Sequence, residues 1–328
     1  MAAASPPPRV YVSRRVPERV RAELERSFAA VFHESEWPPA REELLAGVRG
    51  ADGIVAMLTE RVDDELLDAA GPQLRIVANF AVGYDNVDVD ACARRGVIVS
   101  NTPDVLAEAT AELTIALLLS LARRVTEGDR FLRRREPWSW APTFMLGSSL
   151  RGRLLGVVGL GRIGAEVARL ARALGMEVVY SGRSGPKPGV PYEHLPLEEL
   201  LRRADVVTLH CRLTPETRHL IGAEQLRAMR RDAFLVNTAR GPVVDEAALV
   251  EALREGEIAG AALDVFEREP EVHPGLLTLE TVVLAPHLGS ATRETREAMG
   301  MLCVEALRAV LLEGRRPANA VTAEEKAA

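Results

Sequence analysis

Short apolar runs alternate along this chain with stretches in which apolar side chains recur every three or four residues. In the first part of the chain the apolar runs lie at 9–13, 54–58, 74–78 and 97–100, and helical patterns lie at 17–28 and 63–70. From residue 154 onward the runs lie at 154–158, 177–180, 205–210, 233–237, 260–263 and 281–284, and helical patterns at 163–174, 197–203 and 245–255. This repeated strand–helix order predicts α/β architecture with parallel, doubly wound sheets.

Two long helical patterns indicate how the chain is divided. Thr102-Pro103-Asp104 breaks the first block and is expected to cap a helix over about 105–125. A last helix at 292–312 follows the final strand and is expected to pack back on the first block. We therefore predict a discontinuous, smaller flavodoxin-like α/β domain, 1–103 plus 291–328, and a Rossmann-type domain, 104–290.

Composition narrows the classes of protein to consider. The 328 residues can form two domains of ordinary size, and the net charge of −6 argues against nucleic acid or an anionic membrane as partner. The most apolar stretch, 113–121, is too short for a membrane span. Cys92, Cys211 and Cys303 are too widely spaced for a metal cluster, so no metal is predicted. Residues 1–8 resemble no targeting segment, and a cytoplasmic location is expected.

The segment 157–164, Val-Val-Gly-Leu-Gly-Arg-Ile-Gly, joins an apolar strand to a helix through a G-x-G-x-x-G turn. Gly159 permits the tight turn, Gly161 lets the backbone approach a pyrophosphate, and Gly164 lets the helix pack close to the strand. The helix N-terminus offers amide groups and partial positive charge to an anion. Together with Leu160, Arg162 and Ile163, these glycines are predicted to bind a dinucleotide.

The turn after the second strand of this unit bears on which dinucleotide is bound. NAD sites usually carry Asp or Glu here, for the ribose 2′-hydroxyl, whereas this chain reads Tyr180-Ser181-Gly182-Arg183-Ser184. An Arg with nearby hydroxyl groups suits a 2′-phosphate. The turn therefore favours NADP(H), with NAD(H) as the second option. The alternative is a solvated turn in which Arg183 is merely exposed and binds no phosphate.

Polar side chains follow three strands whose carboxyl ends are expected to meet at one sheet edge, where ligands bind. These are Arg240, Glu269 and His287. The Arg suits a carboxylate, the His suits proton transfer to a carbonyl oxygen, and the Glu suits orientation of that His. With hydride from a nicotinamide cofactor, this set predicts reduction of a 2-oxo acid.

Motifs over nearly the whole chain resemble the D-isomer-specific 2-hydroxyacid dehydrogenases. They are Gly-Leu-Gly-Arg-Ile-Gly, Asn-Thr-Ala-Arg-Gly at 237–241, Leu-Asp-Val-Phe-Glu-x-Glu-Pro at 263–270 and Pro-His-Leu-Gly-Ser at 286–290. The resemblance implies Arg240 as substrate anchor and Glu269–His287 as the acid/base pair. It also implies that Val82 and Gly83 bind the substrate carboxylate through backbone amides, whereas from the residues alone they form an ordinary glycine turn.

Within this family the chain is most similar to the glyoxylate/hydroxypyruvate reductase branch. That similarity implies a homodimer in which Trp140 reaches the neighbouring active site and limits substrate size; Trp138 and Trp140 covering a seam between domains is the alternative. The resemblance also places Arg212 in the cofactor loop, at a position where the family commonly has a smaller residue. The cofactor-binding set further includes Thr214, Pro215, Thr238, Ala239, Arg240, Asp264, His287 and Gly289.

The expected function is NADPH-preferring reduction of glyoxylate to glycolate and of hydroxypyruvate to D-glycerate. The first alternative is another D-2-hydroxyacid dehydrogenase, of D-lactate or phosphoglycerate type. The second is a dinucleotide-sensing binding protein similar to the corepressors of the same superfamily, which also carry the Arg–Glu–His set. The acidic net charge gives that second alternative no support.

Overall fold

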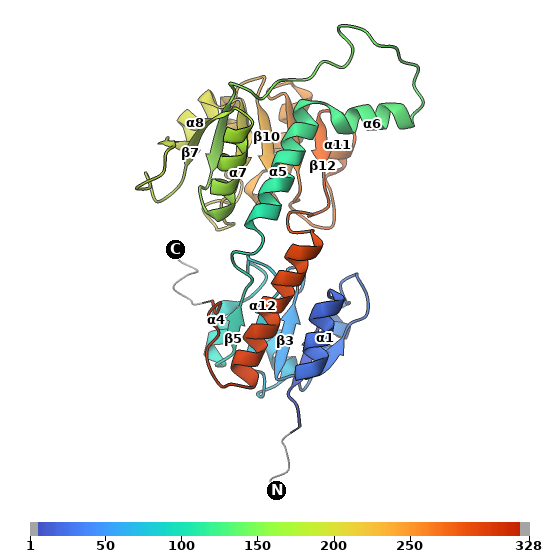
Figure 1. Ribbon diagram of the computed structural model, residues 1–328, viewed down its shortest axis with the longest axis vertical. Coiled ribbons are helices and arrows are strands. Elements are labelled where there is room, and N and C mark those ends of the chain that lie inside the picture. The colour runs from blue at the N-terminus through green and yellow to red at the C-terminus, as the bar shows by residue number, and fades with distance from the viewer. Residues whose placement is uncertain (1–5, 322–328) are drawn as a thin grey trace. The chain divides into compact units, whose positions relative to one another are not determined.

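The structure, a computed structural model, describes residues 6–321. Within these residues the chain forms two compact units: unit 1, from 6–106 and 292–321, and unit 2, from 107–291. Figure 1 shows the elements of both. Because unit 1 takes its last helix from the end of the chain, its polypeptide is discontinuous.

Unit 1 contains a five-stranded parallel sheet in the order β2-β1-β3-β4-β5. Its strands are β1 (Arg9–Val12), β2 (Ala29–Phe32), β3 (Gly53–Ala56), β4 (Ile76–Asn79) and β5 (Ile98–Ser100). In the central register Ile54 pairs with Tyr11 on one side and Val77 on the other. This strand order is that of the flavodoxin-like fold.

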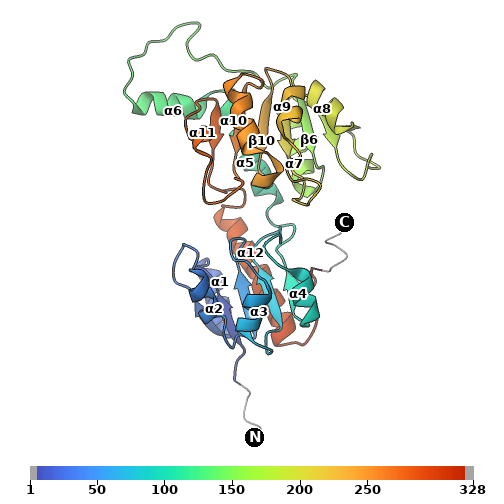
Figure 2. The same ribbon diagram turned by 180° about the vertical axis from the view of Figure 1, so that it is seen from behind.

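Helices cover both faces of this sheet. They are α1 (Glu18–Ser27), α2 (Arg41–Gly47), α3 (Asp64–Ala70), α4 (Val89–Arg94) and α12 (Arg293–Leu311). Figure 1 shows α1 and α12 on one face, and Figure 2 shows α2 and α3 on the other. Val304 and Leu307 of α12 are fully buried in one core with Val10 and Ile76. The apolar stripe of α12 therefore completes the core of unit 1.

Unit 2 contains a seven-stranded parallel sheet in the order β12-β11-β10-β9-β6-β7-β8. Its strands are β6 (Leu154–Val158), β7 (Glu177–Ser181), β8 (Glu193–His194), β9 (Val206–Leu209), β10 (Phe234–Asn237), β11 (Gly260–Leu263) and β12 (Val282–Leu284). The strand order reverses beside β6, as in a Rossmann-type sheet. The predicted fold class, with two parallel α/β domains, is confirmed.

Most helices of unit 2 pack on one or the other face of its sheet. The helices of this unit are α5 (Ala107–Ala122), α6 (Val125–Arg133), α7 (Arg162–Ala173), α8 (Leu197–Arg203), α9 (Ala223–Ala228), α10 (Glu246–Arg254) and α11 (Pro274–Leu277). Figure 1 shows α5 and α7 on one face of the sheet, and Figure 2 shows α8, α9 and α10 on the other. The apolar stretch 113–121 lies in α5, which is largely buried. Within residues 6–321 no helix is both long and apolar enough to cross a membrane.

The helix expected over 105–125 differs from the structure. α5 begins at Ala107, after Asp104 with a φ of +72°, and ends at Ala122. A separate helix, α6, starts after Arg124, whose φ is +54°. A left-handed residue interrupts the helical hydrogen-bond ladder, so the chain changes direction there. α6 and the segment after it extend away from the sheet of unit 2 (Figures 1 and 2). All residues of α6 are among those that the structure describes, and none of their side chains is buried.

Candidate active site

The glycine turn 159–164 is held tightly between β6 and α7. A Cβ on Gly159, whose φ is +94°, would lie 2.7 Å from the backbone nitrogen of Cys211. A Cβ on Gly164 would lie 2.4 Å from the carbonyl oxygen of Gly159. Gly161 is the N-cap of α7, and no side chain of the described residues caps that helix. Because the N-cap residue has no side chain that could accept from the amides of the first turn, the turn fits the pyrophosphate of a dinucleotide.

The turn after β7 is joined to this glycine turn. The Gly159 amide donates to the Ser181 carbonyl oxygen at 2.9 Å, and Nζ of Lys187 donates to that of Leu160 at 2.6 Å. Ser181 is buried, and Gly182, Arg183 and Ser184 are exposed.

The charge of Arg183 acts on the loop 211–216. The pKa of Glu216 is lowered, mainly by a hydrogen bond from the Thr214 side chain. The Glu216 backbone amide and the charge of Arg183 act in the same direction. Burial raises the pKa of the Cys211 thiol to about 11, with a smaller opposing effect from Arg183. The Thr217 hydroxyl donates to the Arg212 carbonyl oxygen at 2.6 Å and accepts from the Thr214 amide at 2.7 Å. This loop therefore presents Thr214 and Pro215 in a fixed conformation.

Glu269 and His287 form a pair just beyond β11 and β12. Nδ1 of His287 lies 2.8 Å from Oε2 of Glu269, and the other carboxylate oxygen accepts from the Phe266 amide at 3.1 Å. Both side chains are about one-quarter exposed. Burial opposes ionisation of the Glu269 carboxyl, but the hydrogen bond and charge of His287 outweigh it and lower the pKa of Glu269. The contact with Glu269 engages Nδ1, so Nε2 is the ring nitrogen of His287 that does not face this carboxylate.

Asp264 holds the backbone that carries His287. Its carboxylate accepts from the amides of Leu288 at 2.6 Å and Gly289 at 2.8 Å, and it is 1% exposed. The His287 amide donates to the Asp264 carbonyl oxygen at 2.8 Å, and His287 has a φ of +54°. Burial raises the pKa of Asp264, and the two amides oppose that rise. These bonds give Asp264 a positioning role for His287; its contact with the dinucleotide stays a prediction.

Arg240 lies in a loop fixed by residues at the end of β10. The buried Asn237 side chain donates to the Arg240 carbonyl oxygen at 2.9 Å and accepts from the Ala239 amide at 3.0 Å. The Thr238 hydroxyl lies 2.9 Å from that of Thr114 in α5. The charge of Arg240 contributes to the low pKa of Glu269, so the guanidinium acts on the same site as the pair.

Gly241 brings the Arg240 loop against the loop that carries Glu269. It opens the short 3₁₀ turn η1 (Gly241–Val243), and a Cβ there would lie only 1.8 Å from the backbone carbon of Phe266. Only glycine fits this contact. Asn237 and Gly241 were not among the predicted site residues, although a polar side chain closing an apolar strand and a glycine directly after Arg240 were visible signals.

The other predicted substrate residues belong to two further segments of the chain. Val82 and Gly83 follow β4 in unit 1, where the side chains of Asn101 and Asn79 donate to their carbonyl oxygens at 2.9 and 2.8 Å. This loop therefore has a defined shape. Trp140 lies in the segment after α6 and is 80% exposed, and Trp138 is also exposed.

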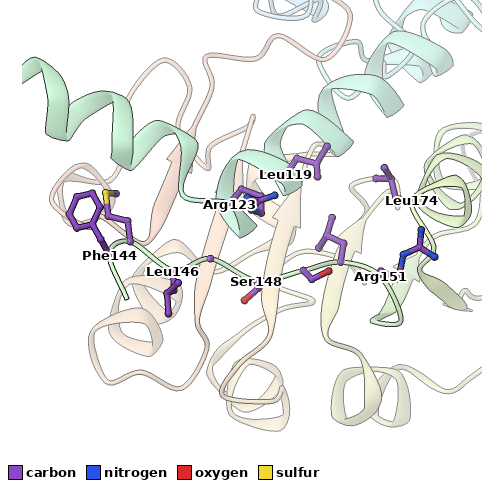
Figure 3. Close-up of a pocket in the computed structure, with 11 residues that line it drawn as sticks. Leu119, Arg123, Phe144, Leu146, Ser148, Arg151 and Leu174 are labelled. Atoms are coloured by element: carbon purple, nitrogen blue, oxygen red, sulfur yellow. The ribbon is translucent and has the colours of Figure 1, made fainter. Parts of the chain in front are cut away.

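We call Arg240, Glu269 and His287 the triad. A pocket of about 600 Å³, which none of the three lines, lies where the segment after α6 meets α5. Figure 3 shows Leu119 and Arg123 on one side of the pocket, with Phe144, Leu146 and Ser148 along the chain that borders it.

Among residues 6–321 no group of His, Cys, Asp or Glu could hold a metal ion. The three cysteines, all in that range, are free thiols.

Comparison with known proteins places this geometry in a family. Residues 115–289 match the NAD-binding domain of D-isomer-specific 2-hydroxyacid dehydrogenases. A glyoxylate reductase of Korarchaeum cryptofilum is 49% identical over 324 residues, 97% of this chain and 96% of the relative. One from Aeropyrum pernix is 48% identical over 326 residues, 97% and 96% of the two chains.

Solved structures agree. A Thermus thermophilus protein, 49% identical, has a TM-score of 0.91 over 96% of this chain and 100% of its own. An NADPH-dependent glyoxylate/hydroxypyruvate reductase of Sinorhizobium meliloti, solved with NADP and malonate, is 38% identical, with a TM-score of 0.83 over 97% of each chain. The resemblance found in the sequence motifs is thereby confirmed: this chain belongs to the D-isomer-specific 2-hydroxyacid dehydrogenase family.

Proposed function

We propose that this enzyme reduces small 2-oxo acids with a preference for NADPH, converting glyoxylate to glycolate and hydroxypyruvate to D-glycerate in the cytoplasm. The observation that carries the proposal is the 2.8 Å contact between His287 and Glu269, beside the Arg240 loop on the sheet that also carries the glycine turn. The names of the relatives support the same substrates.

Each residue of the triad has a distinct part in the proposed reaction. When bound, the reduced nicotinamide supplies a hydride to the carbonyl carbon of the substrate. Nε2 of His287 donates a proton to the carbonyl oxygen, so the oxo group becomes a hydroxyl group. Glu269 orients the imidazole through Nδ1 and stabilises its protonated form. Arg240 binds the substrate carboxylate, together with the backbone amides of Val82 and Gly83.

We assign unit 2 as the cofactor-binding domain and unit 1 as the substrate domain. In unit 2 the glycine turn binds the pyrophosphate, and the turn 181–184 binds the 2′-phosphate. The remaining proposed contacts come from loops at the carboxyl ends of the strands, namely Thr214, Pro215, Thr238, Ala239, Asp264 and Gly289.

A substrate panel tests the proposal directly. Purified protein is expected to oxidise NADPH with glyoxylate or hydroxypyruvate and much more slowly with pyruvate, followed by absorbance. Faster turnover of pyruvate or 3-phosphohydroxypyruvate would instead assign a lactate-type or phosphoglycerate-type dehydrogenase. Dinucleotide binding without turnover of any 2-oxo acid would favour a sensor.

Arg183→Ala is expected to raise the Michaelis constant for NADPH at least about tenfold more than that for NADH. A charge-assisted contact with phosphate contributes about 1.5–3 kcal/mol to binding. NADH has no 2′-phosphate, so its binding does not include this contact and should not weaken when Arg183 is removed. Both constants are measured at saturating glyoxylate.

Ser181→Asp is expected to shift the cofactor preference in the same direction, because a carboxylate repels the 2′-phosphate and can accept from a ribose hydroxyl.

The control for Arg183→Ala is Arg227→Ala, which removes an Arg from the last turn of α9. An equal effect of Arg183→Ala on both cofactors would remove Arg183 from the phosphate site.

We propose that the protein is a homodimer and that Trp140 limits substrate size in the partner's active site. Val125, Leu132, Trp138, Trp140 and Leu146 are all more than half exposed on α6 and its following segment. Such an apolar surface is typical of an interface.

Light scattering at assay concentration is therefore expected to give the mass of a dimer. Trp140→Ala is expected to raise kcat/KM for bulkier 2-oxo acids relative to glyoxylate, because a large side chain no longer narrows the site. A stable, fully active monomer would contradict both parts of this prediction.

Glu269→Gln is expected to remove the acid limb of the pH profile for reduction. In the wild type His287 lowers the pKa of Glu269, so the carboxylate that supports the imidazole remains charged below the ordinary range of a Glu. Wild-type activity should therefore fall only as the pH drops through that lowered pKa. The variant has no carboxylate to titrate, so this limb should be absent, and its rate should be lower than that of the wild type at neutral pH. An acid limb that persisted in Glu269→Gln, measured where hydride transfer limits the rate, would argue against the pair.

A further inference from the structure

A second histidine–glutamate pair lies in the same loop as the first. Glu267, two residues before Glu269, accepts a short hydrogen bond from Nε2 of His219. Nδ1 of His219 lies 3.9 Å from the Asp245 carboxylate. His219 has a φ of +52°, a conformation that costs a non-glycine residue free energy. The strained backbone places its imidazole between two carboxylates.

The backbone of His219 is tied to the segment that follows Arg240. The His219 amide donates to the Pro242 carbonyl oxygen at 2.8 Å, and the Ile221 amide to that of Val243 at 3.0 Å. The Asp245 amide donates back to Ile221 at 3.0 Å. His219 therefore joins the Arg240 loop, through its backbone, to the Glu269 loop, through its side chain.

Glu246 holds Glu267 from the other side. Its side chain is buried, and Oε1 accepts from the Glu267 amide at 2.7 Å. Burial raises the pKa of Glu246, and the hydrogen bond from the Glu267 amide opposes this rise without cancelling it. His219 thus fixes the side chain of Glu267, and Glu246 fixes its backbone. We call His219, Glu246 and Glu267 the loop clasp.

The loop clasp has a short path to the proton-transfer pair. Gly241 contacts the backbone of Phe266 and Glu267, and the Phe266 amide donates to Oε1 of Glu269. A shift of residues 266–267 would therefore move the Glu269 carboxylate relative to His287. Small displacements of catalytic groups have large effects on rate.

We propose that the loop clasp consists of positioning residues for the reductase reaction, which hold the Arg240 loop and the Glu269 loop in register. This inference rests on the proposed function for its kinetic readout. Its action passes through Glu269 and Arg240, and it touches neither substrate nor cofactor.

His219→Ala is expected to lower kcat on glyoxylate roughly tenfold, with the Michaelis constant for NADPH unchanged, because the glycine turn is not involved. The acid limb of kcat should move to higher pH, since a displaced Glu269 loses part of the contact that lowers its pKa. His219→Gln keeps a nitrogen donor for Glu267 and should recover most of the rate. Glu267→Gln should resemble His219→Ala in its acid limb.

The matched control is His33→Ala, which removes a different His–Glu pair in unit 1, with Glu43 at 3.4 Å. It should leave kcat and the acid limb unchanged. Wild-type kcat and an unmoved acid limb in His219→Ala would overturn the proposal. A loss of thermal stability without a change in kcat at saturation would also overturn it, because that is the result of a purely structural contact.

Amide hydrogen exchange gives a readout that is independent of turnover. The Phe266 amide donates a hydrogen bond to the Glu269 carboxylate. This amide should exchange faster in His219→Ala than in the wild type or in His33→Ala. If the wild type reduced no 2-oxo acid, the proposed function would fail, and the exchange rates would still decide whether the loop clasp orders this loop. Equal protection of Phe266 in all three proteins would contradict it.

Discussion

His287→Ala is expected to lower kcat for glyoxylate reduction by about a hundredfold to ten-thousandfold, the usual range for loss of a general acid. In the structure Nδ1 of His287 is committed to Glu269, and Asp264 fixes the surrounding backbone, so the imidazole is presented in one orientation. The measurement is single-turnover oxidation of bound NADPH. Alanine places no proton donor at this position.

Affinity for the dinucleotide distinguishes loss of chemistry from loss of structure. The glycine turn does not depend on the imidazole, so fluorescence titration of His287→Ala should give a dissociation constant for NADPH within a few-fold of wild type. His33→Ala controls for removal of a histidine. A variant that retained more than a tenth of the wild-type single-turnover rate would exclude His287 as the proton donor.

The strands of both sheets were largely predictable because a parallel sheet covered on both faces needs continuous apolar runs. β1, β6 and β10 all begin within one residue of the start expected from their runs. β2 was missed because it is an edge strand whose side chains alternate in exposure, and β8 because it has only two residues. The break between α5 and α6 depends on the φ of Arg124, a residue with no sequence signal for that conformation.

The grouping of the candidate site followed from one rule, that the ends of parallel strands share an edge. That rule predicted that Glu269 and His287 lie near each other. It gave no information on the supports around them, because hydrogen bonds such as those of Asp264 and Asn237 depend on loop conformation. Glu267 was part of a recognised motif, but its partner His219 lies 48 residues away and follows no periodic pattern.

Gly241→Ala is expected to lower kcat/KM by roughly a hundredfold and the free energy of unfolding by about 2–3 kcal/mol. The added Cβ would lie 1.8 Å from the Phe266 backbone carbon and 2.4 Å from the Glu267 nitrogen, so the two loops must separate. Neither contact is with the end of a flexible side chain, and overpacking against backbone costs stability. Because the loops carry Arg240 and Glu269, their separation also misplaces the reacting groups.

Gly222→Ala provides the matched control, since its Cβ would meet nothing closer than 3.5 Å in the same unit. Its kcat/KM and its midpoint of chemical denaturation should stay close to wild type. Gly241→Ala should show its loss in kcat/KM under conditions where circular dichroism reports a folded protein, and NADPH affinity should fall much less than turnover. This pattern separates loop misplacement from unfolding, because an unfolded protein loses both together. Wild-type turnover in folded Gly241→Ala would show that the close contact of the two loops is not needed to align the triad.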